Sequence, residues 1–124
     1  MEKLALENPK KYFADLALCY NSFGLFYKRN GNRKKAEYYL NQAIALRENL
    51  AKENPEKFNP GLAISYDNLA MLYKQNNRKK AEDLYLKALD IWKYMVELDL
   101  EKYIPDLSIC YNCLLYTSPS PRDA

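Results

Sequence analysis

The chain has 124 residues, 48% hydrophobic and 28% charged, which is enough apolar sequence for one small folded domain. The absence of histidine excludes a histidine-based catalytic site, and three glycines leave no room for a glycine-rich phosphate loop. A net charge of +3 is too small to indicate nucleic-acid binding, and no run of about eighteen apolar residues predicts a membrane span. Three cysteines are typical of a reducing compartment, so we expect a cytoplasmic protein.

Short segments of the chain recur 45 or 46 residues apart. The matched segments are Leu4–Pro9 with Leu50–Pro55, Leu16–Asn21 with Leu62–Asp67 and Leu107–Asn112, and Asn32–Glu37 with Asn77–Glu82. Matches at separated places in one register indicate a repeated structural unit.

Each unit predicts two helices in chain order. Apolar residues at helical spacing mark the first helix of each unit: Leu16, Tyr20, Phe23, Gly24 and Tyr27, then Leu62, Tyr66, Leu69, Ala70 and Tyr73. Asn30-Gly31-Asn32 and Asn76-Asn77 end these helices, because Asn and Gly tolerate the left-handed conformation.

The second helix of each unit runs to about residue 53 or 99. Its apolar positions are Ala36, Leu40, Ala43 and Ile44, or Ala81, Tyr85, Ala88, Leu89 and Trp92. Asn54–Asn59 is predicted to be a linker, and Pro60 and Pro105 are predicted to open the next first helices, where a proline's missing N–H costs nothing. The small residues of both helices predict close helix crossings, with large Tyr or Leu side chains beside them.

These residues resemble the tetratricopeptide repeat, whose pattern is W-x-x-L-G-x-x-Y followed by A-x-x-x-F and A. The first unit has Tyr20-x-x-Phe23-Gly24-x-x-Tyr27, then Ala36-x-x-x-Leu40 and Ala43. The second has Tyr66-x-x-Leu69-Ala70-x-x-Tyr73, then Ala81-x-x-x-Tyr85 and Ala88. The resemblance implies an all-α fold, a right-handed α-solenoid of antiparallel helix pairs. The long period is similar to that of the kinesin-light-chain-like subgroup.

The repeats divide the chain into five segments. Residues 1–7 match the end of a preceding second helix, 8–53 form repeat 1, 54–99 repeat 2, and 100–112 the start of repeat 3. We therefore expect a fragment of a longer array, in which Leu107 and Ile109 are exposed where a further helix would pack.

The last segment, residues 113–124, breaks from the repeat pattern. Its sequence, CLLYTSPSPRDA, resembles the translation of a transposase adapter used in sequencing libraries. We expect a non-native tail that contributes nothing to the fold. The alternative is a genuine Ser/Pro-rich tail. In either case Cys110 and Cys113 form a C-x-x-C without the βαβ context of a redox motif, so Cys110 is interpreted as a small buried residue.

Basic clusters recur at Arg33-Lys34-Lys35 and Arg78-Lys79-Lys80, with Lys28-Arg29 before the first. They could form a positive stripe for an acidic partner, although solvated turns explain them better, because acidic residues are interspersed throughout the chain. Tyrosines could stack on bases, but most lie at packing positions of the repeat. We expect no nucleic acid, membrane or small-molecule substrate as a partner.

The resemblance implies that the first helices line a concave binding face. The family's groove-facing positions fall on Asn21, Ser22, Leu25, Lys28 and Arg29, then on Asp67, Asn68, Met71, Lys74 and Gln75, and on Asn112. An asparagine amide can donate to and accept from an extended peptide backbone. Lys28, Asn68 and Lys74 supply only part of the carboxylate clamp of the chaperone-binding subgroup, and Asp67 would repel a carboxylate, so this clamp is not predicted.

The predicted function is therefore a scaffold that binds a protein or an extended peptide. The alternative is a regulatory or sensor segment of a larger enzyme or transcription regulator, with the effector domain elsewhere. No carboxylate pair or metal-ligand cluster stands out, so we expect neither an enzyme nor a cofactor or metal site.

Overall fold

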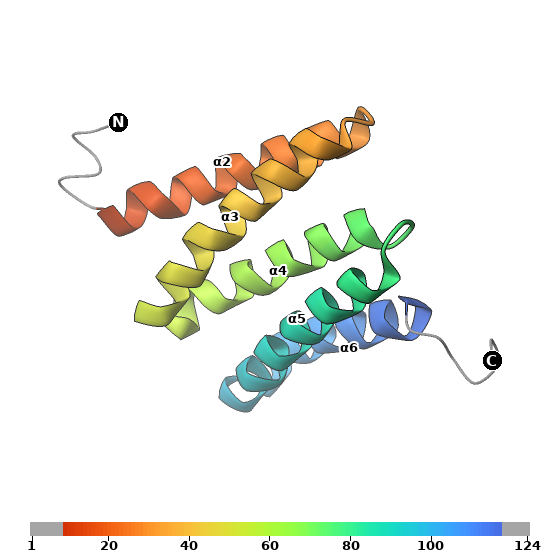
Figure 1. Ribbon diagram of the computed structural model, residues 1–124. Coiled ribbons are helices and arrows are strands. Elements are labelled where there is room, and N and C mark those ends of the chain that lie inside the picture. Colours follow the sequence, from red (N-terminus) through yellow and green to blue (C-terminus); the bar gives the residue numbers. More distant parts are fainter. Residues whose placement is uncertain (1–8, 118–124) are drawn as a thin grey trace.

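In the computed structural model, which describes residues 9–117, five helices follow one another along the chain (Figure 1). They are α2 (Pro9–Arg29), α3 (Arg33–Glu53), α4 (Pro55–Tyr73), α5 (Arg78–Leu98) and α6 (Leu100–Thr117). Each helix packs against the next, α2 also touches α4, and no strand occurs in this part of the chain. The stack of consecutive helix pairs confirms the predicted all-α solenoid. Residues 1–7, assigned to a preceding repeat, and residues 118–124 of the tail lie outside the described residues.

Four of the helices begin with the same side-chain hydrogen bond. The side-chain oxygen of Asn32, Asn54, Asn77 or Asp99 accepts from the backbone N–H three residues later, at 3.1–3.3 Å. Such a cap satisfies an N–H that the first helical turn leaves without a partner, and contributes about 1 kcal/mol. Asn54 and Asp99 also end the preceding helix, because their own N–H donates to the carbonyl four residues earlier. A single residue therefore separates α3 from α4, and α5 from α6.

The starts of α4 and α6 differ from the prediction. Pro60 and Pro105 lie inside these helices, and the predicted linker over Asn54–Asn59 is helical from Pro55 onward. The caps start both helices earlier, and Pro55 takes the first position, which suits its missing N–H. A proline further along removes one backbone hydrogen bond, which these well-packed helices tolerate near their starts.

The two turns within the repeats have different backbones. Gly31 has a φ of +78°, the left-handed conformation predicted for the first turn. The second turn has no glycine, and the N–H groups of Asn76 and Asn77 both donate to the carbonyl of Tyr73. No described residue other than glycine has a positive φ, so the prediction of a left-handed asparagine there is wrong.

Small residues lie at the helix crossings, as predicted. Gly24 is buried, and the fully buried alanines include Ala36, Ala43, Ala70, Ala81 and Ala88. A Cβ atom added at Gly24 would lie 2.6 Å from the side chain of Leu40 and 3.3 Å from the carbonyl oxygen of Ala36. A side chain at residue 24 would therefore require the Leu40 side chain to move.

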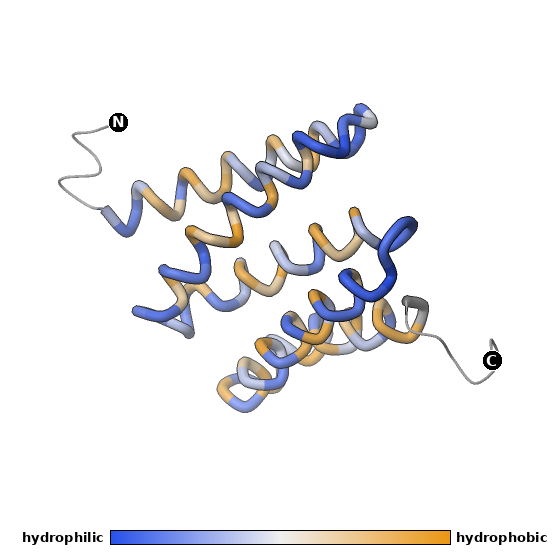
Figure 2. The backbone as a smooth tube through the Cα atoms, viewed as in Figure 1, coloured by the Kyte–Doolittle hydropathy of each residue, from blue (hydrophilic) through white to orange (hydrophobic). Residues whose placement is uncertain are grey.

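Large side chains pack beside the small ones in the core. Figure 2 shows hydrophobic and hydrophilic residues alternating along each helix. Leu40, Tyr85, Trp92 and Met95 are almost fully buried. In α2, by contrast, Tyr20 and Tyr27 are only half-buried, and Phe23, predicted to pack, is 51% exposed. α2 is the first described helix, and no described helix covers its outer side (Figure 1).

α6 continues through Cys113 to Thr117, so the predicted break at residue 113 is wrong. Cys113 and Leu114 are half-buried against the core, because Leu114 follows the buried Cys110 by one helical turn. Whether residues 113–124 are native stays a prediction. Ile109 is 58% exposed, as expected, whereas Leu107 is half-buried. None of the described helices is long and apolar enough to cross a membrane.

Candidate functional site

The residues predicted to face a partner lie on α2, α4 and α6, the first helices of successive repeats, except Lys74 and Gln75, which lie in the turn after α4. They differ in exposure. Asn21 is buried; Leu25, Lys28, Asp67 and Asn68 are half-buried; Ser22, Arg29, Met71, Lys74, Gln75 and Asn112 are exposed. Most of the predicted face is therefore accessible to a partner, at least in part.

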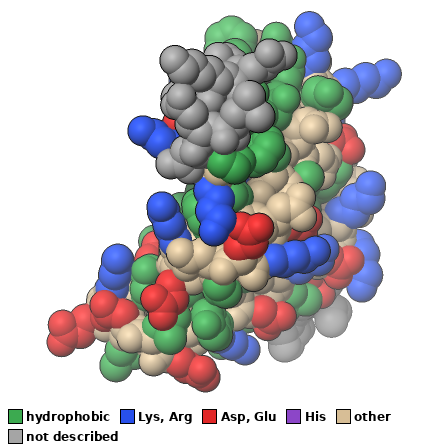
Figure 3. Space-filling view, turned by 90° about the vertical axis from the view of Figure 1, so that its left-hand side faces the viewer, with side chains coloured by type: hydrophobic (Ala, Val, Ile, Leu, Met, Phe, Trp, Pro, Cys, Tyr) green, Lys and Arg blue, Asp and Glu red, His purple; other side chains and the backbone are tan. Residues whose placement is uncertain are grey.

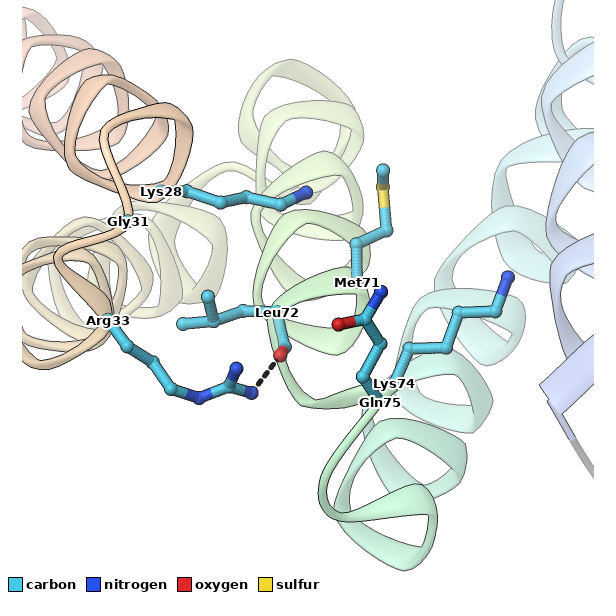
Figure 4. A pocket seen from close by; sticks show the side chains of 7 residues that line it. All are labelled: Lys28, Gly31, Arg33, Met71, Leu72, Lys74 and Gln75. Atoms are coloured by element: carbon cyan, nitrogen blue, oxygen red, sulfur yellow. Dashed lines mark hydrogen bonds between the residues drawn. The ribbon is translucent and has the colours of Figure 1, made fainter.

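Four of these residues line one pocket between the ends of α2 and α4 (Figure 4). The pocket has a volume of about 330 Å³ and is lined by Lys28, Met71, Lys74 and Gln75, together with Gly31, Arg33 and Leu72. Lys28 points from α2 toward α4, whereas Lys74 points away from α2 (Figure 4). The pocket thus joins side chains from two successive repeats. Ser22, Leu25, Arg29 and Asn112 do not line it.

Arg33 lines one side of this pocket, although the sequence did not predict it as a site residue. Its guanidinium donates to the backbone carbonyl of Leu72 and to the side-chain oxygen of Asn76 (Figure 4). α4 ends at Tyr73, so the carbonyl of Leu72 is one that the helix itself leaves without a partner. Arg33 is half-buried and ties the turn of repeat 1 to the end of α4, so its interpretation as a solvated turn residue is wrong. The recurrence of the arginine as Arg78 was the available signal.

The charges around the pocket have one sign. Lys28, Arg33 and Lys74 contribute three cations, and no carboxylate is among the residues that line it. Arg33 donates to neutral oxygens, so its hydrogen bonds do not cancel its charge. Clustered cations raise the local concentration of anionic groups. The pocket is therefore suited to an anionic side chain or a carboxyl terminus.

Asn21 and Asn68 contact each other rather than acting separately. The Nδ2 group of Asn68 donates to Oδ1 of Asn21 at 3.2 Å, and Asn21 is only 8% exposed. This bond ties α2 to α4. An amide has two N–H donors and an acceptor, so Asn68 keeps a second donor and its own carbonyl oxygen for other contacts.

Asp67 lies outside the pocket and interacts with α5 and α6. Its Oδ1 atom is buried and has no hydrogen-bond partner in the described part of the chain. Burial raises the pKa of Asp67 to about 7, a hydrogen bond from Trp92 on α5 opposes this, and the charge of Asp106 on α6 adds to it. A carboxyl with this pKa is partly protonated at neutral pH, so its expected repulsion of an anionic partner is weakened.

Two lysines of the basic clusters have the same structural role in both repeats. The Nζ atoms of Lys35 and Lys80 each lie 5.1 Å from the centre of a tyrosine ring, Tyr27 and Tyr73 respectively. Such a cation–π contact contributes about 0.5–1 kcal/mol at an exposed site. It offsets the unfavourable position of a cation at a helix N-terminus. These lysines are therefore not simply solvated.

The two cysteines of the C-x-x-C sequence have environments that oppose thiol chemistry. Cys110 is fully buried, as predicted, and its thiol donates to the carbonyl of Tyr85 at 3.5 Å. Burial raises the pKa of the Cys110 thiol to about 12, and burial also raises the pKa of the Cys113 thiol. Because the thiolate is the reactive form, both thiols are poor nucleophiles.

The face of the molecule seen in Figure 3 carries Lys and Arg side chains interspersed with Asp and Glu. This mixture extends the alternation of charges in the sequence to the folded surface. Within residues 9–117, no group of three His, Cys, Asp or Glu side chains is placed to hold a metal ion.

The helix pairs and the contacts repeated between them agree with a comparison against known protein families. Residues 16–56 and 62–93 match the tetratricopeptide repeat. The chain belongs to the tetratricopeptide repeat family. Comparisons with curated proteins and with solved structures gave no match. Tetratricopeptide repeats generally mediate protein–protein interaction and are typically non-enzymatic scaffolds, and the matched residues fall in both repeats of this chain.

Proposed function

We propose that this chain binds an extended segment of a partner protein along the face formed by α2 and α4, which α6 continues. The pocket between the ends of α2 and α4 carries the proposal, because Lys28 and Lys74 bring two successive repeats to one site. A segment that crosses from one repeat to the next would contact both. An extended peptide has this shape, and its backbone offers donors and acceptors along its length.

Three side chains at and after the end of α4 would contact such a peptide. Asn68 and Met71 are three residues apart and share one face of α4, and Gln75 lies in the turn that follows the helix. Asn68 and Gln75 carry amides for the peptide backbone, and Met71 is an exposed, adaptable apolar contact. Lys28 would hold an anionic side chain or terminus in the pocket, and Lys74, at the rim, would contact an anionic group that continues past it.

The same proposal assigns the chain to the cytoplasm and excludes catalysis, nucleic acid, membranes and small-molecule substrates. The sparse cysteines support the compartment. The modest net charge, the raised thiol pKa values and the mixed surface charge support a protein partner. We further propose membership of the kinesin-light-chain-like subgroup, supported by second helices of 21 residues, and an adapter origin for residues 113–124, supported by their sequence.

A random linear peptide library tests this proposal. Peptides selected on the parent chain should be enriched in Asp, Glu or a free carboxyl terminus. Lys28→Ala combined with Lys74→Ala should weaken their binding at least tenfold, because each substitution removes a charge-assisted contact of about 1 kcal/mol or more. Binding is measured by titration calorimetry or fluorescence anisotropy.

Lys34→Ala combined with Lys79→Ala is the matched control. It removes the same charge from exposed lysines of the second helices, outside the pocket. Equal weakening by the two double variants would show that net charge rather than the pocket governs binding. Tight, strongly salt-dependent binding of a single-stranded oligonucleotide by the parent chain would replace the peptide proposal with a nucleic-acid one.

A further inference from the structure

Successive first helices carry an equivalent pair of neighbouring positions, 46 and then 45 residues apart. The first position is Asn21, Asp67 and Asn112, and the second is Ser22, Asn68 and Cys113. We call the first position of one repeat and the second position of the next an inter-repeat pair. The chain contains two such pairs, Asn21 with Asn68 and Asp67 with Cys113.

The first inter-repeat pair forms a hydrogen bond. Asn68 donates to the buried Asn21 at 3.2 Å and so ties α4 to α2. The bond forms because one partner offers an amide N–H and the other an oxygen. The same helix geometry should bring the second pair together between α4 and α6.

The second inter-repeat pair, Asp67 with Cys113, forms no such hydrogen bond. The repeat register that pairs Asn21 with Asn68 also pairs Asp67 with Cys113, and the charge of Asp67 raises the pKa of the Cys113 thiol. Yet Oδ1 of Asp67 is buried without a hydrogen-bond partner in residues 9–117. Cys113 interacts instead with Tyr85 of α5, and a thiol is a weak donor in any case. The acceptor is thus present and an adequate donor is lacking.

The other nearby groups leave Oδ1 of Asp67 unpaired. A hydrogen bond from Trp92 acts on the Asp67 carboxyl, and the charge of Lys74 acts on the Cys113 thiol. Around Asp67, α5 presents Tyr85 and Trp92, and α6 presents Asp106, Cys110 and Cys113. From α3, Glu37, Arg47 and Glu48 hydrogen-bond to Tyr73, Ser65 and Tyr66 of α4. None of the groups that set the pKa of Asp67 is a cation.

We propose that Asp67 is the acceptor half of an inter-repeat hydrogen bond whose donor half, at position 113, fits an amide side chain and is left empty by Cys113. An amide there would tie α6 to α4 as Asn68 ties α4 to α2. The inference concerns how the repeats are joined. It depends neither on peptide binding nor on the origin of Cys113.

The test compares Cys113→Asn with Cys113→Val in the full chain. The two side chains are similar in size, but only asparagine can donate. Cys113→Asn should lower the pKa of Asp67 by about one, because a hydrogen bond to the ionised carboxylate favours that form. It should also raise the thermal midpoint at pH 8 above that of the parent and of Cys113→Val. The carboxyl carbon of Asp67 is titrated by NMR, and unfolding is followed by circular dichroism.

A second set of variants separates the hydrogen bond from better packing. Asp67→Asn with Cys113→Asn restores two amides, as in the first pair, whereas Asp67→Ala with Cys113→Asn leaves no acceptor. The stabilisation from Cys113→Asn should therefore survive in the Asp67→Asn background and disappear in the Asp67→Ala background. The proposal is wrong if Cys113→Val matches Cys113→Asn in both measurements, if the pKa of Asp67 does not fall, or if Cys113→Asn unfolds a chain that Cys113→Val leaves folded.

Discussion

Gly24→Ala tests how closely α2 and α3 cross. An added Cβ would lie 2.6 Å from both Cγ and Cδ2 of Leu40, which is fully buried. Overpacking of this kind costs about 1–3 kcal/mol, whereas replacing a helical glycine by alanine returns about 1 kcal/mol of helix propensity. The net expectation is a loss of about 1–2 kcal/mol in the free energy of unfolding.

Gly61→Ala is the matched control, because this helical glycine is not at a crossing. An added Cβ would meet only the Arg47 side chain, at 3.5 Å or more, which is ordinary contact. Only the propensity gain applies, so Gly61→Ala should stabilise the chain by up to about 1 kcal/mol. The two variants make the same chemical change and should move stability in opposite directions.

The assay is urea unfolding followed by circular dichroism, with the midpoint and slope fitted for each variant. Leu40→Ala should reduce the cost of Gly24→Ala in the double variant, because it removes the atoms that clash. If Gly24→Ala stabilises the chain as much as Gly61→Ala does, then α2 and α3 do not approach as described and the assigned crossing is wrong.

Two further predictions concern the contacts between repeats. Arg33→Ala should destabilise the chain by about 1–2 kcal/mol, because it leaves the carbonyl of Leu72 without its donor. The control, Lys34→Ala, should change the free energy of unfolding by less than about 0.5 kcal/mol. Equal effects of the two variants in urea unfolding would show that Arg33 does not tie the repeats together. Burial raises the pKa of Asp67 from 3.8 to about 7, so the folded chain binds this proton more tightly than the unfolded chain does. The contribution of Asp67 to stability should be complete below about pH 4 and lost as the pH rises through 7. The free energy of unfolding of the parent, relative to that of Asp67→Asn, should therefore fall over that interval. A difference that does not change with pH would contradict the burial of this carboxyl.

Much of the fold could be predicted from the sequence because the same pattern of helical residues occurs in both repeats. Matched segments 45 or 46 residues apart located both helix pairs, and small residues located their crossings. The helix starts could not be placed as well, because two signals competed. Pro60 and Pro105 suggested a start, whereas the caps at Asn54 and Asp99 begin the helices earlier. A capping side chain satisfies N–H groups, and a proline only avoids needing one.

The candidate site was predicted in part. Lys28, Met71, Lys74 and Gln75 do line one pocket, because the end of α2 lies beside the end of α4 and the turn that follows it. Arg33 was missed because its partner, the carbonyl of Leu72, is a backbone group 39 residues away that no side-chain pattern reveals.

The burial of Asn21 was missed for a related reason. Its hydrogen bond with Asn68 depends on how two repeats stack, and the sequence gives no measure of the distance between them. The contacts of Lys35 and Lys80 could not be predicted from the sequence either. Their charge suggests solvent, while the fold places each over a tyrosine ring.

The central claim is that α2 and α4 form a peptide-binding face centred on their shared pocket. It is tested most directly by NMR on the isotope-labelled chain, with peptides selected from the random library added in steps. The largest backbone shifts should fall at Lys28, Met71, Lys74 and Gln75, and should disappear in the Lys28→Ala and Lys74→Ala double variant. Shifts that concentrate instead around Lys34 and Lys79, at the starts of α3 and α5, would contradict the claim and move the binding site to the basic turns.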